Sequence, residues 1–154
     1  MDFKVGVGKS DFAEIRKSEN YYVDKTELIY ELVHDTDNKV TLFTRPRRFG
    51  KTLMISMIEN FFSIRKDSRD IFEGLAITKH QDFCKEWMNQ YPVLFVSFKD
   101  VDANTFEGAY KMLGASIADL CKKFPDIEKS ASVNQADLDA FNHLMFQKAG
   151  EQDV

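Results

Sequence analysis

The chain has 154 residues, of which 44% are hydrophobic and 30% are charged, and its formal net charge is −4 at pH 7. This length suits one domain with a buried core, and the composition is ordinary for a globular protein. The acidic balance argues against general affinity for nucleic acid, and no apolar run reaches the roughly 20 residues of a membrane span. The start lacks the apolar core of a signal peptide, and Cys84 and Cys121 are too far apart in the sequence to suggest a metal-binding pair. We therefore expect a cytoplasmic protein without a membrane segment.

The first third of the chain predicts two capped helices followed by a strand. Ser10 or Asp11 can cap a short helix over residues 10–18, and Glu14, three residues after Asp11, can act as a capping-box partner. A second helix is predicted over residues 24–35, with Asp24 as its N-cap. Residues 39–44, KVTLFT, are short and rich in β-formers, so they predict a strand.

The rest of the chain predicts more helices around a second strand. Apolar residues cover most of the circumference of a helix over residues 51–64, so we expect it to be largely buried. A further helix is predicted over residues 81–90. Residues 93–98, VLFVSF, form a nearly continuous apolar run, which is typical of a strand buried on both faces of a parallel sheet. Helices over residues 104–124 and 134–148 follow. Strands alternating with helices predict an α/β fold.

Basic residues are concentrated in one segment of this acidic chain. No aspartate or glutamate occurs between positions 38 and 58, and the segment contains the cations Lys39, Arg45, Arg47, Arg48 and Lys51. Such a segment is suited to an anionic ligand.

Two segments end in the Gly-Lys-[Ser/Thr] of a phosphate-binding loop, and the first of them is GVGKS, residues 6–10. The full pattern needs a strand before the loop and a helix that starts at the lysine. No strand precedes residues 6–10, and Asp11 and Glu14 occupy the first turn of the following helix. These carboxylates would repel phosphate, so we interpret GVGKS as a lead-in to a capped helix.

The second segment is TRPRRFGKTL, residues 44–53, and it has a predicted strand before it and an acid-free helix after it. Arg45 stands where the pattern has its first glycine, and Pro46 removes an amide donor. We therefore predict an altered phosphate loop. Two alternatives remain open, a solvated basic turn and a contact with the backbone of a nucleic acid through Arg45, Arg47 and Arg48.

Longer stretches resemble the bacterial AAA-ATPase-like domain proteins. The resemblance lies in YYVDKTELIYELV and VTLFTRPRRFGKTLMISMIENFF, and FEGLAI and YPVLFVSFKD are similar to later blocks of the same domain. It implies a partial three-layer P-loop NTPase-like core of parallel strands flanked by helices, in which residues 44–53 form the Walker A loop. Family members are longer, with a Walker B strand and often a C-terminal module similar to PD-(D/E)XK nucleases. Residues 1–154 would then be the N-terminal part of one domain, ending before the Walker B strand.

The resemblance also implies a site for ATP or ADP with Mg²⁺. Lys51 would contact the β- and γ-phosphates and Thr52 would bind the metal, within a set comprising Arg47, Arg48, Phe49, Gly50, Lys51, Thr52 and Leu53. No catalytic residue is identified, because the acidic Walker B pair is not found, so we expect nucleotide binding with slow hydrolysis or none. A nucleic acid is an expected partner through the longer parent protein, and a homo-oligomer is expected through an exposed sheet edge. The other alternative is a non-catalytic interaction domain.

Overall fold

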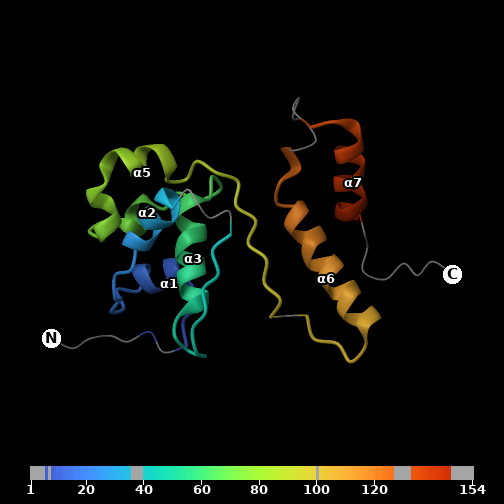
Figure 1. The fold of residues 1–154 in the computed structure, drawn as a ribbon, viewed down its shortest axis with the longest axis horizontal. Helices are drawn as coiled ribbons and strands as arrows, with labels where there is room; N and C mark the ends of the chain where they lie inside the picture. The colour runs from blue at the N-terminus through green and yellow to red at the C-terminus, as the bar shows by residue number, and fades with distance from the viewer. Residues whose placement is uncertain (1–5, 7, 36–39, 100, 127–132, 147–154) are drawn as a thin grey trace. The chain divides into compact units, whose positions relative to one another are not determined.

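A computed structural model describes residues 6, 8–35, 40–99, 101–126 and 133–146, and it divides the chain into two compact units, Met1–Val93 and Leu94–Val154 (Figure 1). The first unit contains α1 (Phe12–Lys17), α2 (Glu27–His34), α3 (Lys51–Phe62), α4 (Arg69–Phe72), the 3₁₀ helix η1 (Ala76–Lys79) and α5 (Gln81–Trp87). The second unit contains α6 (Phe106–Cys121) and α7 (Gln135–Phe146), which pack against each other. Among the described residues, no helix is long and apolar enough to cross a membrane.

The predicted α/β fold is wrong, because the described backbone forms helices and contains no β-strand or sheet. Neither residues 40–44 nor residues 93–98 pair as strands, and the one β-contact between described residues is an isolated parallel bridge from Ser63 to Tyr91. A strand is stable only when a neighbour pairs its backbone groups and covers its side chains. Here Leu42 is 82% exposed and Leu94 is 65% exposed. A helical fold therefore replaces the predicted three-layer parallel core. The described residues also provide no sheet edge for the expected homo-oligomer contact.

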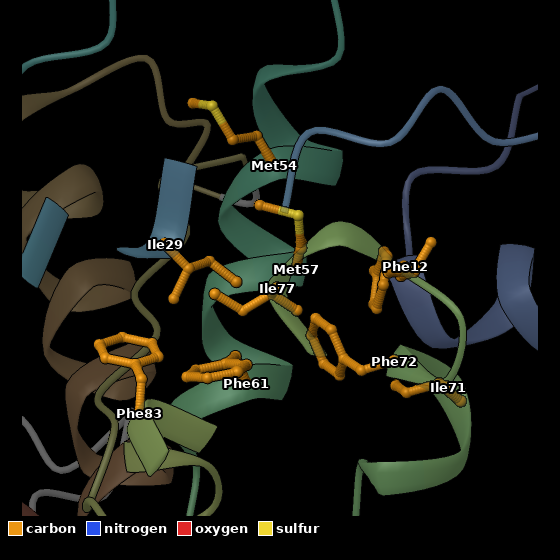
Figure 2. Close-up of a cluster of buried hydrophobic side chains, with 10 residues drawn as sticks. Phe12, Ile29, Met54, Met57, Phe61, Ile71, Phe72, Ile77 and Phe83 are labelled. Carbon is orange, nitrogen blue, oxygen red and sulfur yellow. The ribbon is translucent and has the colours of Figure 1, made fainter. Parts of the chain in front are cut away.

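Helix α3, which the sequence predicted to be largely buried, contributes several buried side chains to the core of the first unit. Met57 and Phe61 of this helix have no exposed surface, and side chains from the surrounding helices pack around them (Figure 2). The ring of Phe61 lies 5.3 Å from that of Phe72 and 5.8 Å from that of Phe83. Helices α1, α2, α4, α5 and η1 all contribute to this apolar cluster, so the position of α3 is fixed along its buried face.

Helix α1 is tied to α3 at its first turn. The Asp11 carboxylate accepts a hydrogen bond from the Glu14 amide at 2.8 Å, which confirms the predicted cap. The same carboxylate accepts a bond from the Ser56 hydroxyl at 3.1 Å, and the Phe12 amide donates to that hydroxyl at 3.0 Å. These bonds, together with the burial of Phe12, place the segment before α1 beside the first half of α3 (Figure 1).

Asp24 does not cap α2, where Thr26 takes the N-cap position without a side-chain cap bond. The Asp24 carboxylate instead accepts hydrogen bonds from the Thr26 amide at 2.9 Å, the Thr26 hydroxyl at 2.7 Å and the Ala76 amide at 2.7 Å. Burial opposes ionisation of this carboxyl, but the hydrogen bonds outweigh burial and lower its pKa below the usual 3.8. Asp24 thus links the segment before α2 to η1 through its charged form.

Replacing Asp24 with asparagine is expected to lower the melting temperature at neutral pH by about 5 °C, because the Thr26 and Ala76 donors lose a charged acceptor. The folded pKa is depressed, so this stabilisation is complete above about pH 4 and is lost as the pH falls through the folded pKa. Thermal melts of both proteins between about pH 7 and about pH 3 should therefore converge at the acid end. Asp82→Asn, at a fully exposed side chain, is the matched control. A difference in melting temperature that is constant across this range would contradict the role given to Asp24.

In the second unit, α6 begins as its sequence predicted. The Thr105 hydroxyl accepts a hydrogen bond from the Gly108 amide at 3.1 Å and so caps the helix. Asn134 precedes α7, and its side-chain oxygen accepts a bond from the Asp137 amide at 2.9 Å. Both helix starts follow from local capping.

Candidate functional site

The part of TRPRRFGKTL that precedes α3, residues 44–50, is called the basic loop here. It meets the helix at Gly50, which is the N-cap and has φ of 74°. The helix begins at Lys51, and its first turn contains no acidic residue. The first amides of a helix have no partner within the helix, and they carry the positive end of the helix dipole. This end of α3 is therefore able to accept an anion.

The loop before α3 contains a second residue in the left-handed region, Arg48, with φ of 66°. This conformation is uncommon for a residue with a side chain and costs of the order of 1 kcal/mol. Phe49, between Arg48 and Gly50, is 60% exposed. The loop therefore turns tightly into the helix with Arg48 in an unfavourable conformation.

Lys51 closes the loop onto itself. Its ammonium donates hydrogen bonds to the backbone carbonyl of Arg45 and, at 3.0 Å, to that of Pro46. Arg45 and Pro46 are the two residues that break the phosphate-loop pattern, yet each acts here through a carbonyl, which every residue type provides. The Lys51 ammonium is thus held across the mouth of the basic loop.

A cavity of about 990 Å³ opens beside this helix start, and its volume is at the upper end for small-molecule sites. Its loop side is lined by Arg47, Arg48, Gly50, Lys51, Thr52 and Leu53. These are six of the seven residues that the sequence predicted for the site. Phe49, the seventh, instead lines a smaller hollow of about 250 Å³ that also contacts Lys51. The cavity lining contains several cations, and no carboxylate is found among its described residues.

The same cavity is lined by four residues of the segment set aside as a lead-in, namely Gly6, Gly8, Lys9 and Ser10. The Lys9 ammonium lies 2.8 Å from the Glu14 carboxylate and donates to the Ser18 hydroxyl at 3.0 Å. The Glu14 carboxylate of α1 therefore neutralises the positive charge of Lys9. The two Gly-Lys-[Ser/Thr] segments are neighbours in space, and nothing in their separate patterns indicated this.

Thr52 is the residue that the sequence predicted as a metal ligand. Among the described residues, no group of three or more histidine, cysteine, aspartate or glutamate side chains is arranged to hold a metal. Thr52 lines the cavity at the second position of α3 and supplies one hydroxyl. Mg²⁺ is commonly held by one or two protein oxygens together with phosphate oxygens and water, so this residue fits such an ion.

Comparison with known proteins identifies the family. The family model described as "Predicted AAA-ATPase" matches residues 6–154. The chain belongs to this predicted AAA-ATPase family. A curated relative described as an uncharacterized protein in the vnfD 5′ region of Azotobacter chroococcum mcd 1 is 33% identical over 96 residues. The matched region is 62% of this chain but 17% of the relative, and no solved structure shows a significant match.

Family membership confirms the resemblance seen in the sequence. Two of the sequence blocks that resemble the family, YYVDKTELIYELV and VTLFTRPRRFGKTLMISMIENFF, line the same hollow in the structure. The smaller hollow is lined by Lys25, Glu27 and Leu28 of the block YYVDKTELIYELV. Its other lining residues come from the loop before α3 and from α3 itself, namely Arg45, Phe49, Gly50, Lys51 and Met54. The Glu27 carboxylate also lies 2.7 Å from the His80 ring. The loop before α3 is thus bordered by the start of α2 as well as by the lead-in to α1.

Proposed function

We propose that this chain binds ATP or ADP, with the phosphates at the start of α3. The observation that carries the proposal is the cavity wall made by the basic loop and the first residues of α3, which presents Arg47, Arg48 and Lys51 without an opposing carboxylate. Helix N-termini combined with cations are suited to phosphate groups. Membership of the predicted AAA-ATPase family supports the nucleotide over other phosphate compounds.

Each of these groups has a distinct task in holding the phosphates. The Lys51 ammonium has three donors, and the carbonyls of Arg45 and Pro46 accept from two of them, so the third can donate to a phosphate oxygen. The free amides of the first turn of α3 can donate to further phosphate oxygens. Mg²⁺, when bound with the nucleotide, would neutralise part of the phosphate charge, and the Thr52 hydroxyl is the residue that would hold it.

Isothermal titration calorimetry of the chain with Mg-ATP and with Mg-ADP tests the proposal. A single site per chain is expected for both nucleotides. The absence of heat for either ligand would contradict it. Binding of duplex DNA that is weakened by salt, lost on reversing the charge of Arg47 and indifferent to ATP would favour the nucleic-acid alternative.

Bound ATP is expected to be hydrolysed slowly or not at all by this chain. Attack on the γ-phosphate needs a side chain that positions or deprotonates water, and no carboxylate is found among the described residues that line the cavity. Release of inorganic phosphate, followed over time, should match that of a Lys51→Ala protein prepared in the same way. Phosphate release that rises with the amount of wild-type protein and disappears in Lys51→Ala would contradict this expectation.

A further inference from the structure

The cavity beside α3 has a second wall, which the basic loop does not provide. This wall is lined by Gly6, Gly8, Lys9, Ser10, Ile15 and Tyr21. The only charged side chain in this set is that of Lys9, which is matched by Glu14 at 2.8 Å. The cavity therefore combines a strongly cationic wall with one that has little net charge.

The second wall has both an aromatic ring and accessible backbone. Tyr21 is 58% exposed, so this aromatic residue is accessible at the surface of the cavity. Gly8 has φ of 80°, and no atom lies within 4 Å of the position that a Cβ would take, so its backbone can be approached closely. The Ser10 hydroxyl adds a group that can both donate and accept.

A buried donor lies behind this wall. Asn20 is 7% exposed, and its amide nitrogen has no hydrogen-bond partner in the described part of the chain. A Cβ on Gly6 would lie 3.4 Å from that nitrogen, so the donor is directly beside the cavity lining. Unpaired buried donors are rare in folded proteins, and they occur where a ligand or water completes the site.

We propose that the second wall is a nucleoside subsite, in which Tyr21 stacks on the base while Gly6, Gly8 and Ser10 contact the ribose and the base edge. This inference rests on the proposed function, since it assigns the nucleoside half of the same ligand. A ligand with phosphates at one end and a flat aromatic base at the other matches a cavity with one cationic and one weakly charged, aromatic wall. A polyphosphate alone would leave the second wall without contacts.

Calorimetry with Mg-ATP and with magnesium tripolyphosphate distinguishes the nucleoside subsite from the phosphate site. For Tyr21→Ala, the affinity for Mg-ATP is expected to fall by about tenfold or more, which is the effect of losing one base-stacking ring. The affinity for magnesium tripolyphosphate, which has no nucleoside, is expected to stay unchanged. Tyr21→Phe retains the ring and is expected to bind Mg-ATP as the wild type does. Val23→Ala, at a residue 56% exposed that does not line the cavity, is the matched control.

The outcomes distinguish this inference from the proposed function. If Tyr21→Ala binds Mg-ATP as tightly as the wild type while Lys51→Ala does not, the nucleoside subsite is overturned and the phosphate site stands. Equal losses of ATP and tripolyphosphate affinity in Tyr21→Ala would also overturn it, because the ring would then act on the loop. If the wild type binds neither ligand, the proposed function fails. Circular dichroism checks folding, and Tyr21→Leu replaces Tyr21→Ala if the latter unfolds.

Discussion

Lys51→Ala is expected to weaken Mg-ATP binding by about 100-fold or more. The substitution removes a charge-assisted hydrogen bond to phosphate, which contributes about 1.5–3 kcal/mol. It also removes the two hydrogen bonds by which the ammonium holds the carbonyls of Arg45 and Pro46, so the loop loses its closure. Both effects act on the phosphates, so binding of magnesium tripolyphosphate should fall in parallel. Calorimetry with each ligand measures the two losses.

Lys85→Ala is the matched control for this experiment. Lys85 is 75% exposed and forms a surface pair with Asp82 at 3.2 Å, so its loss should change neither the fold nor the affinity. Circular dichroism of all three proteins verifies that the helices remain. Equal affinities of the wild type and Lys51→Ala for Mg-ATP would contradict a phosphate site at the start of α3.

The longer helices of this chain could be predicted because their determinants are local, whereas the short helices α4 and η1 were not predicted. The Asp11 cap, the Thr105 cap and the start of α3 at Lys51 each depend on residues within a few positions of one another. The strands could not be predicted in the same way. Residues 40–44 have high β-propensity, but a strand also needs a pairing neighbour, and none is found in the described part of the chain.

The candidate site was predicted in part for the same reason. Six of the seven residues predicted for the site line one wall of the cavity, and their binding of a ligand stays a prediction. The sequence treated residues 6–10 as a rival of that loop, because each segment was compared with the pattern separately. Their proximity is tertiary, because the Phe12 amide of α1 donates to the Ser56 hydroxyl of α3 across 44 positions and so holds the two helices side by side. Residue spacing does not contain that information.

Asp24 illustrates the same limit for a polar side chain. Its position before α2 suggested a helix cap. The structure pairs its carboxylate with the Ala76 amide, 52 positions later, as well as with Thr26. A carboxylate can satisfy a cap, a turn or a distant amide equally well, so only the fold decides among them.

Phe61→Ala is expected to lower the free energy of unfolding of the first unit by about 3–5 kcal/mol, the cost of removing a buried phenyl ring and leaving a cavity. Phe61 has no exposed surface, and its ring lies 5.1 Å from that of Phe62, 5.3 Å from that of Phe72 and 5.8 Å from that of Phe83. The chain has a single tryptophan, Trp87, whose ring lies 6.0 Å from that of Phe83. Urea unfolding followed by its fluorescence therefore reports on this unit.

Phe49→Ala is the matched control, because the same ring is removed at a position that is 60% exposed, and the expected change is within about 0.5 kcal/mol. Equal midpoints for the two variants would contradict the central role of α3 in the core.

The experiment also connects the core with the site, since Lys51 and Phe61 belong to one helix. A ligand that binds only the folded state stabilises it by an amount set by its concentration and affinity. If Phe61→Ala leaves the start of α3 intact, saturating Mg-ATP should stabilise the variant and the wild type by equal amounts. A smaller gain in the variant would mean that packing around Phe61 also holds the phosphate site in shape.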